Sequence, residues 1–374
     1  MPLTIAVARE IEDGEKRVAL APDTAKKFSA LGAQIRFERT SGAESHFLDS
    51  DFPDITLADS LANAYANSQL ILRVTPPTLE EIQQIPEGST VIGLMRPFES
   101  KERLQAFNAR KLTVFALELL PRISRAQSMD ALSSQGACAG YQCGLIAAAR
   151  CTKFFPMLTT AAGTIRPARV LVIGAGVAGL QAIATCKRLG AMVEAYDVRA
   201  AAREQIESLG AKFVDTGVSA DGSGGYAREL TAEEKAQQAE KLAKAVAAAD
   251  VVITTAAIPG KKAPVIITEE MVGRMKFGAV IVDMAAETGG NCALTKAGEH
   301  IIANDVNIHG PLNLPSRMPT HASDLYSRNL YNFLSPFIKD GEMNLDWEDE
   351  VLSGTVLCRD GKTVHTTVNQ VLGE

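Results

Sequence analysis

The sequence lacks most of the features that mark metal-bound or disulfide-bonded chains. Its six cysteines form no C-x-x-C pair or other zinc-ligand spacing, so we expect them to be reduced and mostly buried, and we predict no metal site. Aromatic residues make up only 5% of the chain, with a single Trp. Small residues are abundant instead, which favours closely packed layers of helix on sheet.

Signals for membrane insertion or secretion are also missing. The first 17 residues are too acidic, and their apolar run is too short, for a secretory signal. The longest apolar stretch, residues 170–186, is interrupted by three glycines and by Gln181. A strand, a turn and a helix explain this stretch better than a membrane span does. We therefore expect no direct membrane span.

The charge pattern argues against a nucleic-acid partner. The formal net charge is −6, and no stripe of Lys and Arg is present that would neutralise a phosphate backbone. The length of 374 residues exceeds what one compact core usually holds, so two domains are expected.

Short apolar runs alternate with amphipathic stretches in two series. In the first, strands are expected over residues 3–8, 34–38, 69–74, 90–94 and 112–116, with helices over 23–31 and 101–108. A polar segment after Pro121 then leads into a long helical connector rich in small residues. The second series has expected strands at 169–174, 192–197, 212–214, 250–255, 279–284 and 301–308. A helix over 321–340 and a hairpin that turns at Asp360-Gly361 follow.

The strongest motif opens the second series. Gly174, Gly176 and Gly179 form a G-x-G-x-x-G pattern after an apolar strand and at the start of a helix. The first glycine permits the tight turn, the second lets the backbone approach a pyrophosphate, and the third lets helix pack on strand. The next strand ends at Asp197, where an acid that accepts ribose hydroxyls is expected. This combination predicts a dinucleotide-binding domain.

Asp197 favours NAD over NADP because a carboxylate repels a 2′-phosphate. Arg199 keeps NADP open as an alternative, and it could instead reach the adenine or the pyrophosphate. The sequence therefore predicts an α/β fold with two Rossmann-like domains, mostly parallel sheets and a cleft between them. The expected domains are residues 1–135, completed by about 325–374, and the NAD(H)-binding residues 136–324.

Two further segments are candidates for the cofactor site. Residues 218–226 form a glycine-rich loop that ends in Tyr226 and that could close over a bound nucleotide, although a surface turn explains it equally well. Residues 122–133 gather guanidinium, amide, carboxylate and hydroxyl groups that suit a nicotinamide carboxamide and its ribose. The alternative for this polar segment is a capped helix start.

Together these stretches resemble one family, the NAD(H)-binding alpha component of the proton-translocating nicotinamide nucleotide transhydrogenases, over essentially the whole chain. The segments that carry the resemblance are REIEDGEKRVALAP, ELLPRISRAQSMDALSSQ, VLVIGAGVAGLQAIATCKRLGA and VDMAAETGGNCALT. The second of them is the most specific, because it is not a general nucleotide motif.

The resemblance implies direct hydride transfer between NAD(H) here and NADP(H) on a separate component, coupled to proton translocation by a membrane-spanning component (the Si-specific/Re-specific class). It also implies a homodimer, held at the cytoplasmic side of the inner membrane by its partners. The implied reaction residues are Arg122, Gln127, Asp130, Ser133 and Tyr226. The implied cofactor contacts are Arg122, Ile123, Ser124, Arg125, Gly174, Gly176, Val177, Gly179, Asp197, Val198, Arg199, Gly225, Gln238 and Ala257.

Alanine dehydrogenase is the enzymatic alternative, because it shares this fold and the RVALAP signature. Its reaction needs a proton-transferring group. Its pattern has a Lys and a His at two strand ends where this chain offers Thr75 and Met95. Arg73 and Arg96 could bind a carboxylate but are poor proton donors, and the Asp of the last motif is Glu287 here. A non-catalytic, regulatory NAD-binding module is the third hypothesis.

Overall fold

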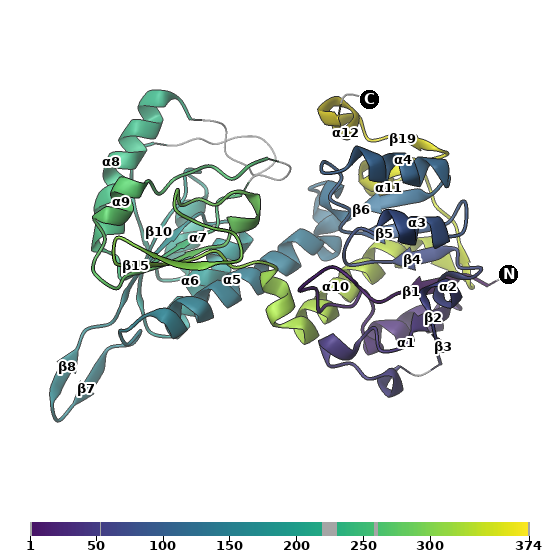
Figure 1. Cartoon of the computed structure of the whole chain (residues 1–374), viewed down its shortest axis with the longest axis horizontal. Helices are drawn as coiled ribbons and strands as arrows, with labels where there is room; N and C mark the ends of the chain where they lie inside the picture. Colours follow the sequence, from purple (N-terminus) through teal and green to yellow (C-terminus); the bar gives the residue numbers. More distant parts are fainter. Residues whose placement is uncertain (1, 53, 219–229, 258–260, 373–374) are drawn as a thin grey trace. The chain divides into compact units, whose positions relative to one another are not determined.

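The computed structural model describes residues 2–52, 54–218, 230–257 and 261–372. The chain forms two compact units (Figure 1). Unit 1 comprises residues 1–135 and 315–374, and unit 2 comprises residues 136–314. The sequence placed the return to the first domain near residue 325. The chain rejoins unit 1 at Pro315 because the helix that follows, α10 (Pro319–Leu334), buries Ala322, Tyr326 and Leu330 from its first turn onward.

Unit 1 is built on one sheet that is parallel over most of its width. Strands β3-β2-β1-β4-β5-β6 follow the order of a doubly wound nucleotide-binding sheet, and all their pairings are parallel. The last two strands, β18 and β19, are antiparallel. The bounds are β1 (Thr4–Val7), β2 (Gln34–Glu38), β3 (Thr56–Ala58), β4 (Leu70–Leu72), β5 (Thr90–Gly93), β6 (Thr113–Ala116), β18 (Val356–Arg359) and β19 (Lys362–Thr363).

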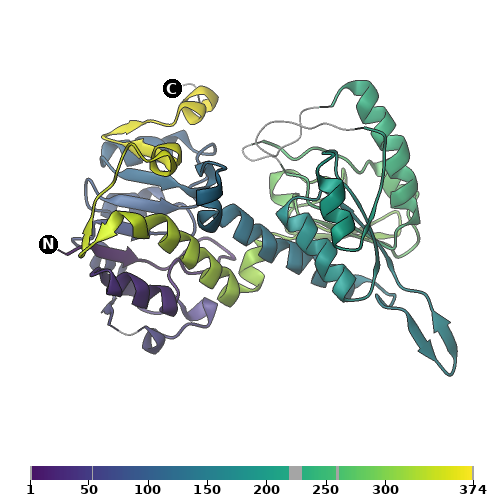
Figure 2. The same ribbon diagram turned by 180° about the vertical axis from the view of Figure 1, so that it is seen from behind.

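Helices cover both faces of this sheet. Ile5 and Val7 of β1 belong to a buried cluster with Tyr326 of α10, whereas Ala6 packs in a second cluster with Phe107 of α4. This alternation puts one apolar cluster on each face. In Figure 2, α10 lies across one of these faces. The remaining helices are α1 (Pro22–Ala30), α2 (Leu61–Tyr65), α3 (Leu79–Gln84), α4 (Lys101–Ala109), α11 (Glu350–Thr355) and α12 (Thr366–Leu372).

Unit 2 repeats the same architecture. Its strand order is β11-β10-β9-β12-β13-β15-β14, parallel except at the β14 edge. Alternate residues of β9 again enter two separate buried clusters, so both faces are covered. The elements are β9 (Arg169–Ile173), β10 (Met192–Tyr196), β11 (Lys212–Phe213), β12 (Val251–Thr254), β13 (Val280–Asp283), β14 (His300–Ala303), β15 (Val306–His309), α6 (Val177–Arg188), α7 (Ala202–Ser208), α8 (Ala232–Ala248) and α9 (Glu269–Gly273). The predicted α/β fold with mostly parallel sheets is confirmed.

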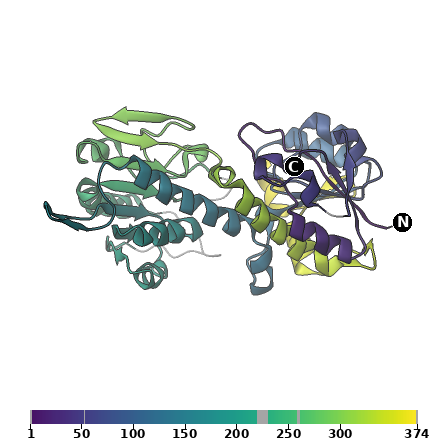
Figure 3. The same cartoon turned by 90° about the horizontal axis from the view of Figure 1, so that it is seen from below.

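The small residues of the connector permit close helix packing. They lie on α5 (Ala131–Arg150), which is a single uninterrupted helix (Figure 3). A Cβ atom placed on Gly140 would lie 2.0 Å from the carbonyl oxygen of Ala178 in α6, and one on Gly144 would lie 2.8 Å from the Thr185 side chain. Only glycine allows the two helices to approach this closely.

Two sequence predictions are wrong in detail. Residues 301–308 form two antiparallel strands instead of one, because Asn304 and Asp305 adopt positive φ angles of 49° and 60° and make a tight turn. The helix predicted over 321–340 ends at Leu334, since Pro336 cannot supply a helical N–H. A short hairpin of β16 (Ile338–Lys339) and β17 (Glu342–Met343) replaces its end.

A further hairpin, in unit 2, was also not predicted. It consists of β7 (Leu158–Thr160) and β8 (Gly163–Ile165) and extends away from the sheet of unit 2 (Figure 1). No helix among the described residues has both the length and the apolar character needed to cross a membrane.

Candidate functional site

The glycine turn lies where β9 ends and α6 begins. Gly174 has a φ of +95°, a conformation that L-residues with side chains rarely adopt. A Cβ atom on Gly179 would lie 1.9 Å from the carbonyl oxygen of Gly174, so the third glycine brings the helix against the turn. Gly176 is exposed and has no atom within 4 Å of the corresponding Cβ position. Each glycine therefore has the environment that the motif predicts.

The turn lies at the switch point of the sheet, between β9 and β12, where doubly wound folds bind ligands. Gly176 is the N-cap of α6, so the backbone N–H groups of the first helical turn face the open side of the loop. Thr255, which follows β12, donates from its Oγ1 to the carbonyl oxygen of Gly174 at 3.0 Å. Sequence reasoning missed this support for the turn, because Thr255 lay at the end of a predicted strand.

Asp197 lies at the end of β10, as predicted, but its oxygens are already occupied. They accept hydrogen bonds from the N–H groups of Ala175 and Arg199 and from Nε and Nη2 of Arg199, at 2.7–2.8 Å. Burial opposes ionisation, but these donors outweigh it and hold the pKa of Asp197 below its usual value. Four donors use the acceptor capacity of a carboxylate. Arg199 therefore competes with ribose hydroxyls for Asp197.

The glycine turn fits the pyrophosphate of a nicotinamide dinucleotide as it stands, whereas Asp197 fits the ribose only after a side chain moves. The open backbone at Gly176 and the helix N-terminus suit a pyrophosphate. Asp197 can accept ribose hydroxyls once the Arg199 side chain rotates away. The same ion pair screens the carboxylate charge, which weakens the repulsion expected for a 2′-phosphate.

The other residues implied for cofactor binding in unit 2 gather around the same strand ends. Val177 is 46% exposed at the start of α6, and Ala257 is exposed after β12. Val198 is half-buried beside Asp197. Gln238 of α8 donates from Nε2 to the hydroxyl of Tyr196, the last residue of β10, at 2.7 Å. Gly225 and Tyr226 lie outside the described residues.

The VDMAAETGGNCALT segment braces the loop after β12. Asp283 is fully buried and accepts hydrogen bonds from the N–H groups of Ala285, Asn291 and Cys292 and from the hydroxyls of Thr254 and Thr295. Asn291 in turn bonds both the N–H and the carbonyl oxygen of Ala256. This network fixes the backbone next to Gly174 and Ala257. The sequence offered the motif, but not this role.

The polar segment belongs to unit 1 and forms the 3-10 helix η4 (Ser124–Met129), followed by α5. Arg122, Gln127 and Ser124 are exposed, and Ile123 is half-buried. Asp130 caps α5: its carboxylate accepts from the N–H of Ser133 at 2.9 Å and from its hydroxyl at 2.5 Å. A helix cap and an exposed polar surface are thus both present, and the two sequence hypotheses are compatible.

Arg125 has a partner that the sequence did not suggest. Both terminal nitrogens of its guanidinium bond Asp349 at 2.7 Å, and Asp349 also caps α11. The hydrogen bond from Arg125 holds the pKa of Asp349 below its usual value. In this structure Arg125 therefore anchors the polar segment to the start of α11, while its side chain stays 47% exposed.

The arginine that follows β4 in unit 1, Arg73, is held by ion pairs. Arg73 is fully buried between Glu10 and Glu81, at 3.1 and 2.8 Å. The Thr75 hydroxyl donates to Glu10 at 2.5 Å, and Met95 is 1% exposed. The Thr75 hydroxyl and the Met95 thioether do not take up or release a proton near neutral pH, whereas burial raises the pKa of Glu10 above its usual value.

Arg17, from the RVALAP segment, is also held by a carboxylate. Its Nε and Nη2 bond the two oxygens of Glu15 at 2.8 and 2.6 Å, and its Nη1 donates to Gln135 at 2.9 Å. Burial alone would raise the pKa of Glu15, but the bonds from Arg17 and Ser316 lower it to about 2. The pair is ionised at any physiological pH.

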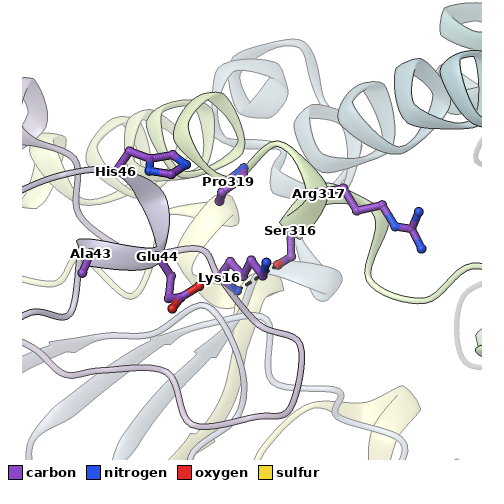
Figure 4. A pocket seen from close by; sticks show the side chains of 7 residues that line it. All are labelled: Lys16, Ala43, Glu44, His46, Ser316, Arg317 and Pro319. Atoms are coloured by element: carbon purple, nitrogen blue, oxygen red, sulfur yellow. Dashed lines mark hydrogen bonds between the residues drawn. The ribbon is translucent and has the colours of Figure 1, made fainter.

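Two cavities lie in unit 1, and the second is lined by Arg73, Thr75 and Arg96, the residues considered above for the alanine dehydrogenase reaction. One of about 340 Å³ is lined by Lys16, Ala43, Glu44, His46, Ser316, Arg317 and Pro319, and the Arg317 side chain points away from the others (Figure 4). The second, of about 220 Å³, is also lined by Arg103. Among the described residues no three His, Cys, Asp or Glu side chains are grouped as metal ligands.

Comparison with known proteins assigns the fold to a family. Residues 6–139 match the family "Alanine dehydrogenase/PNT, N-terminal domain", and residues 143–366 match "Alanine dehydrogenase/PNT, C-terminal domain". The chain belongs to the alanine dehydrogenase/PNT family.

Within this family, the chain is 45% identical to an NAD(P) transhydrogenase alpha-subunit chain of Rhodospirillum rubrum, over 97% of this chain and 98% of that one. A transhydrogenase structure from Sinorhizobium meliloti is 41% identical, with a TM-score of 0.87, over 96% of this chain and 100% of that one. The alanine dehydrogenase of Bacillus subtilis is only 27% identical, over 85% and 81% of the two chains.

The predicted resemblance to the transhydrogenase alpha component is therefore confirmed, with alanine dehydrogenase as the more distant branch of the family. The family and the glycine turn also confirm the predicted cofactor, NAD(H).

Proposed function

We propose that this chain is the NAD(H)-binding component of a proton-translocating nicotinamide nucleotide transhydrogenase. It holds NAD(H) while hydride passes directly to or from NADP(H) on a partner component. The observation that carries the proposal is the similarity to transhydrogenase alpha-subunit chains along nearly the whole length, with an intact glycine turn and an exposed polar segment.

The arrangement of side chains is consistent with this reaction. When bound, NADH supplies a hydride that an oxidised nicotinamide accepts, so that no proton is taken up or released at the reacting carbons. The protein needs only to orient the rings and exclude water. The exposed groups of Arg122, Gln127 and Ser124 are suited to orient a carboxamide. In the proposal, Gly176 and the first turn of α6 hold the pyrophosphate.

The remaining site residues keep their proposed roles, with one condition. Asp197 binds the ribose after Arg199 releases it, whereas Arg125 is held in place by Asp349 and keeps an exposed side chain. Asp130 acts through the start of α5, which it caps, and Ser133 donates from its N–H and its hydroxyl to the Asp130 carboxylate. Tyr226 is proposed to close over the nucleotide.

Alanine dehydrogenase remains the second candidate because of its fold: one L-alanine dehydrogenase structure has a TM-score of 0.82 at 21% identity. The ion pairs of Arg17 and Arg73 argue against it, since both guanidiniums are already bound to carboxylates. Thr75 and Met95 offer no proton. We expect no alanine from NADH, pyruvate and ammonia, and substantial alanine formation would restore this candidate.

The third hypothesis, a regulatory module, predicts a chain that binds NADH and transfers hydride to no partner.

The proposal includes two partner components and a second copy of this chain. One partner binds NADP(H) and the other spans the membrane, and they would keep the chain at the cytoplasmic side of the membrane.

For the second copy of this chain, the β7–β8 hairpin offers two exposed apolar side chains, Met157 at 65% and Ile165 at 46% exposure. Apolar side chains on a projecting arm suit a dimer contact. Sedimentation should give a dimer, and Met157→Glu with Ile165→Glu should weaken it.

A reconstituted reaction tests the proposed function. The chain is mixed with NADH and with a purified NADP(H)-binding component that carries NADP⁺, and formation of NADPH is followed. We expect transfer that requires both proteins. If both proteins bind their nucleotides and no NADPH forms, the proposal is wrong.

A further inference from the structure

Two asparagines on α10 bind the backbone of the polar segment. Asn329 and Asn332 lie three residues apart, and therefore on one face of the helix. Each donates from Nδ2 to the carbonyl oxygen of Ser128 at 2.9 Å. Asn329 also accepts a hydrogen bond from the hydroxyl of Ser134 on α5, at 2.7 Å. One buried amide thus links α10, η4 and α5.

The carbonyl that they hold is next to the residue proposed to orient the nicotinamide. Ser128 directly follows Gln127 and comes two residues before the Asp130 cap. A short 3-10 helix has weak internal hydrogen bonds, and its last carbonyls lack partners within the helix. Two amide donors occupy both lone pairs of the Ser128 carbonyl. The end of η4 is therefore fixed from outside, by α10.

Packing separates the two sides of η4. Ala126 and Met129 are 2% and 4% exposed and lie in the same cluster as Tyr326 and Leu330 of α10. Gln127 points to the exposed side. Because the buried side is held by both apolar contacts and hydrogen bonds, rotation of η4 about its axis would break both. The direction of the Gln127 side chain follows from this attachment.

The burial of Asn329 supports a directional role. Asn329 is 7% exposed and lies beside the buried Leu330 and one turn before the buried Phe333. An apolar residue there would add to the core without the desolvation cost of an amide. The Asn329 amide instead fixes the orientation of η4 relative to α10 and α5, since it donates a hydrogen bond to η4 and accepts one from α5.

We propose that Asn329 is a positioning residue for hydride transfer. It holds the Ser128 carbonyl and so fixes the orientation of Gln127, and Asn332 adds a second bond. The proposal rests on the proposed function, because it assigns the polar segment to the reacting end of the nucleotide. Asn329 itself contacts neither nucleotide.

Asn329→Asp tests this role, because it preserves size and the acceptor for Ser134 but replaces the donor with an oxygen that faces the Ser128 carbonyl. We expect single-turnover hydride transfer to slow by about tenfold or more, since misplacement by about 1 Å costs roughly a hundredfold. The dissociation constant for NADH should change by less than about twofold, because the glycine turn is untouched. Asn332→Ala, at a partly exposed position, should slow transfer by a few fold and keeps the test valid if Asn329→Asp does not fold.

Ser327→Ala is the matched control. Ser327 lies on the same helix, is fully buried and accepts a hydrogen bond from the N–H of Ala21, away from η4. It should lower the melting temperature without changing the transfer rate of the folded protein. If the wild-type chain transfers hydride and both asparagine variants do so at the same rate, the positioning role is refuted. Equal losses of rate and NADH affinity would refute it as well. Failure of the wild-type chain to transfer would instead contradict the proposed function.

Discussion

Alanine at Gly176 should separate nucleotide binding from folding. The residue has a φ of −72°, which alanine adopts without strain, and a Cβ atom would meet no atom within 4 Å. As the N-cap of α6, alanine in place of glycine should cost at most about 1 kcal/mol of stability. The same methyl group would occupy the space through which a pyrophosphate approaches the backbone. Loss of one hydrogen bond to a charged phosphate costs about 1.5–3 kcal/mol, so NADH affinity should fall by roughly 10- to 100-fold.

Gly179→Ala should behave in the opposite way. Its Cβ would lie 1.9 Å from the Gly174 carbonyl oxygen and 2.9 Å from Oγ1 of Thr255, so α6 must move. Such overpacking costs about 1–3 kcal/mol or more, and each kcal/mol lowers the melting temperature of a domain of this size by about 2–4 °C. Gly273→Ala, near only Asn304 at 3.8 Å, is the control. Calorimetric titration with NADH and thermal melts measure both effects. Wild-type NADH affinity in Gly176→Ala would refute the assignment of the pyrophosphate to this turn.

Three further predictions concern charge and position. NADH should bind more tightly than NADPH, as measured by calorimetry with both nucleotides. Arg199→Met should widen this difference in affinity, because it exposes the Asp197 charge, and Asp197→Asn should narrow it. Gln127→Asn, which shortens the amide by one methylene, should slow single-turnover transfer by about a hundredfold with little change in NADH affinity; a normal rate with a lowered melting temperature would contradict the role of Gln127. Burial opposes ionisation of Glu15, but its bonds to Arg17 and Ser316 outweigh burial and hold its pKa at about 2 in the folded chain against an ordinary 4.5; the ionised Glu15 therefore stabilises the fold by roughly 3 kcal/mol above about pH 4.5. This stabilisation is lost as the pH falls towards 2. In Glu15→Gln, the melting temperature should therefore fall less between about pH 4.5 and about pH 2 than it does in the wild-type chain.

Much of unit 2 follows from local sequence. Strands such as β9 and β12 are continuous apolar runs, which is typical of parallel strands buried on both faces. The glycine turn was predictable because positive φ and close approach exclude side chains at Gly174 and Gly179. The hairpin at β14 and β15 was missed because Asn304-Asp305 is a weaker turn signal than a pair with glycine.

Partners that are distant in the sequence could not be predicted in this way. Arg125 bonds Asp349, and Ser128 is held by Asn329, across more than 200 residues in each case. Nothing in the local pattern of α10 distinguishes a buried asparagine that binds another element from one that caps a turn. The sequence left several ligands open for Arg199 but did not suggest its ion pair with Asp197, because that pair depends on how the two side chains are oriented.

Transfer of a label tests the central claim most directly. NADH that carries deuterium at C4 is bound to this chain and mixed with the NADP(H)-binding component and NADP⁺ in ordinary water. Two preparations, labelled on one or the other face of the ring, are compared in a single turnover. Direct transfer predicts that one of them places its deuterium in NADPH without loss to solvent. NADPH that is free of deuterium from both preparations, or no NADPH although both nucleotides are bound, would contradict the account.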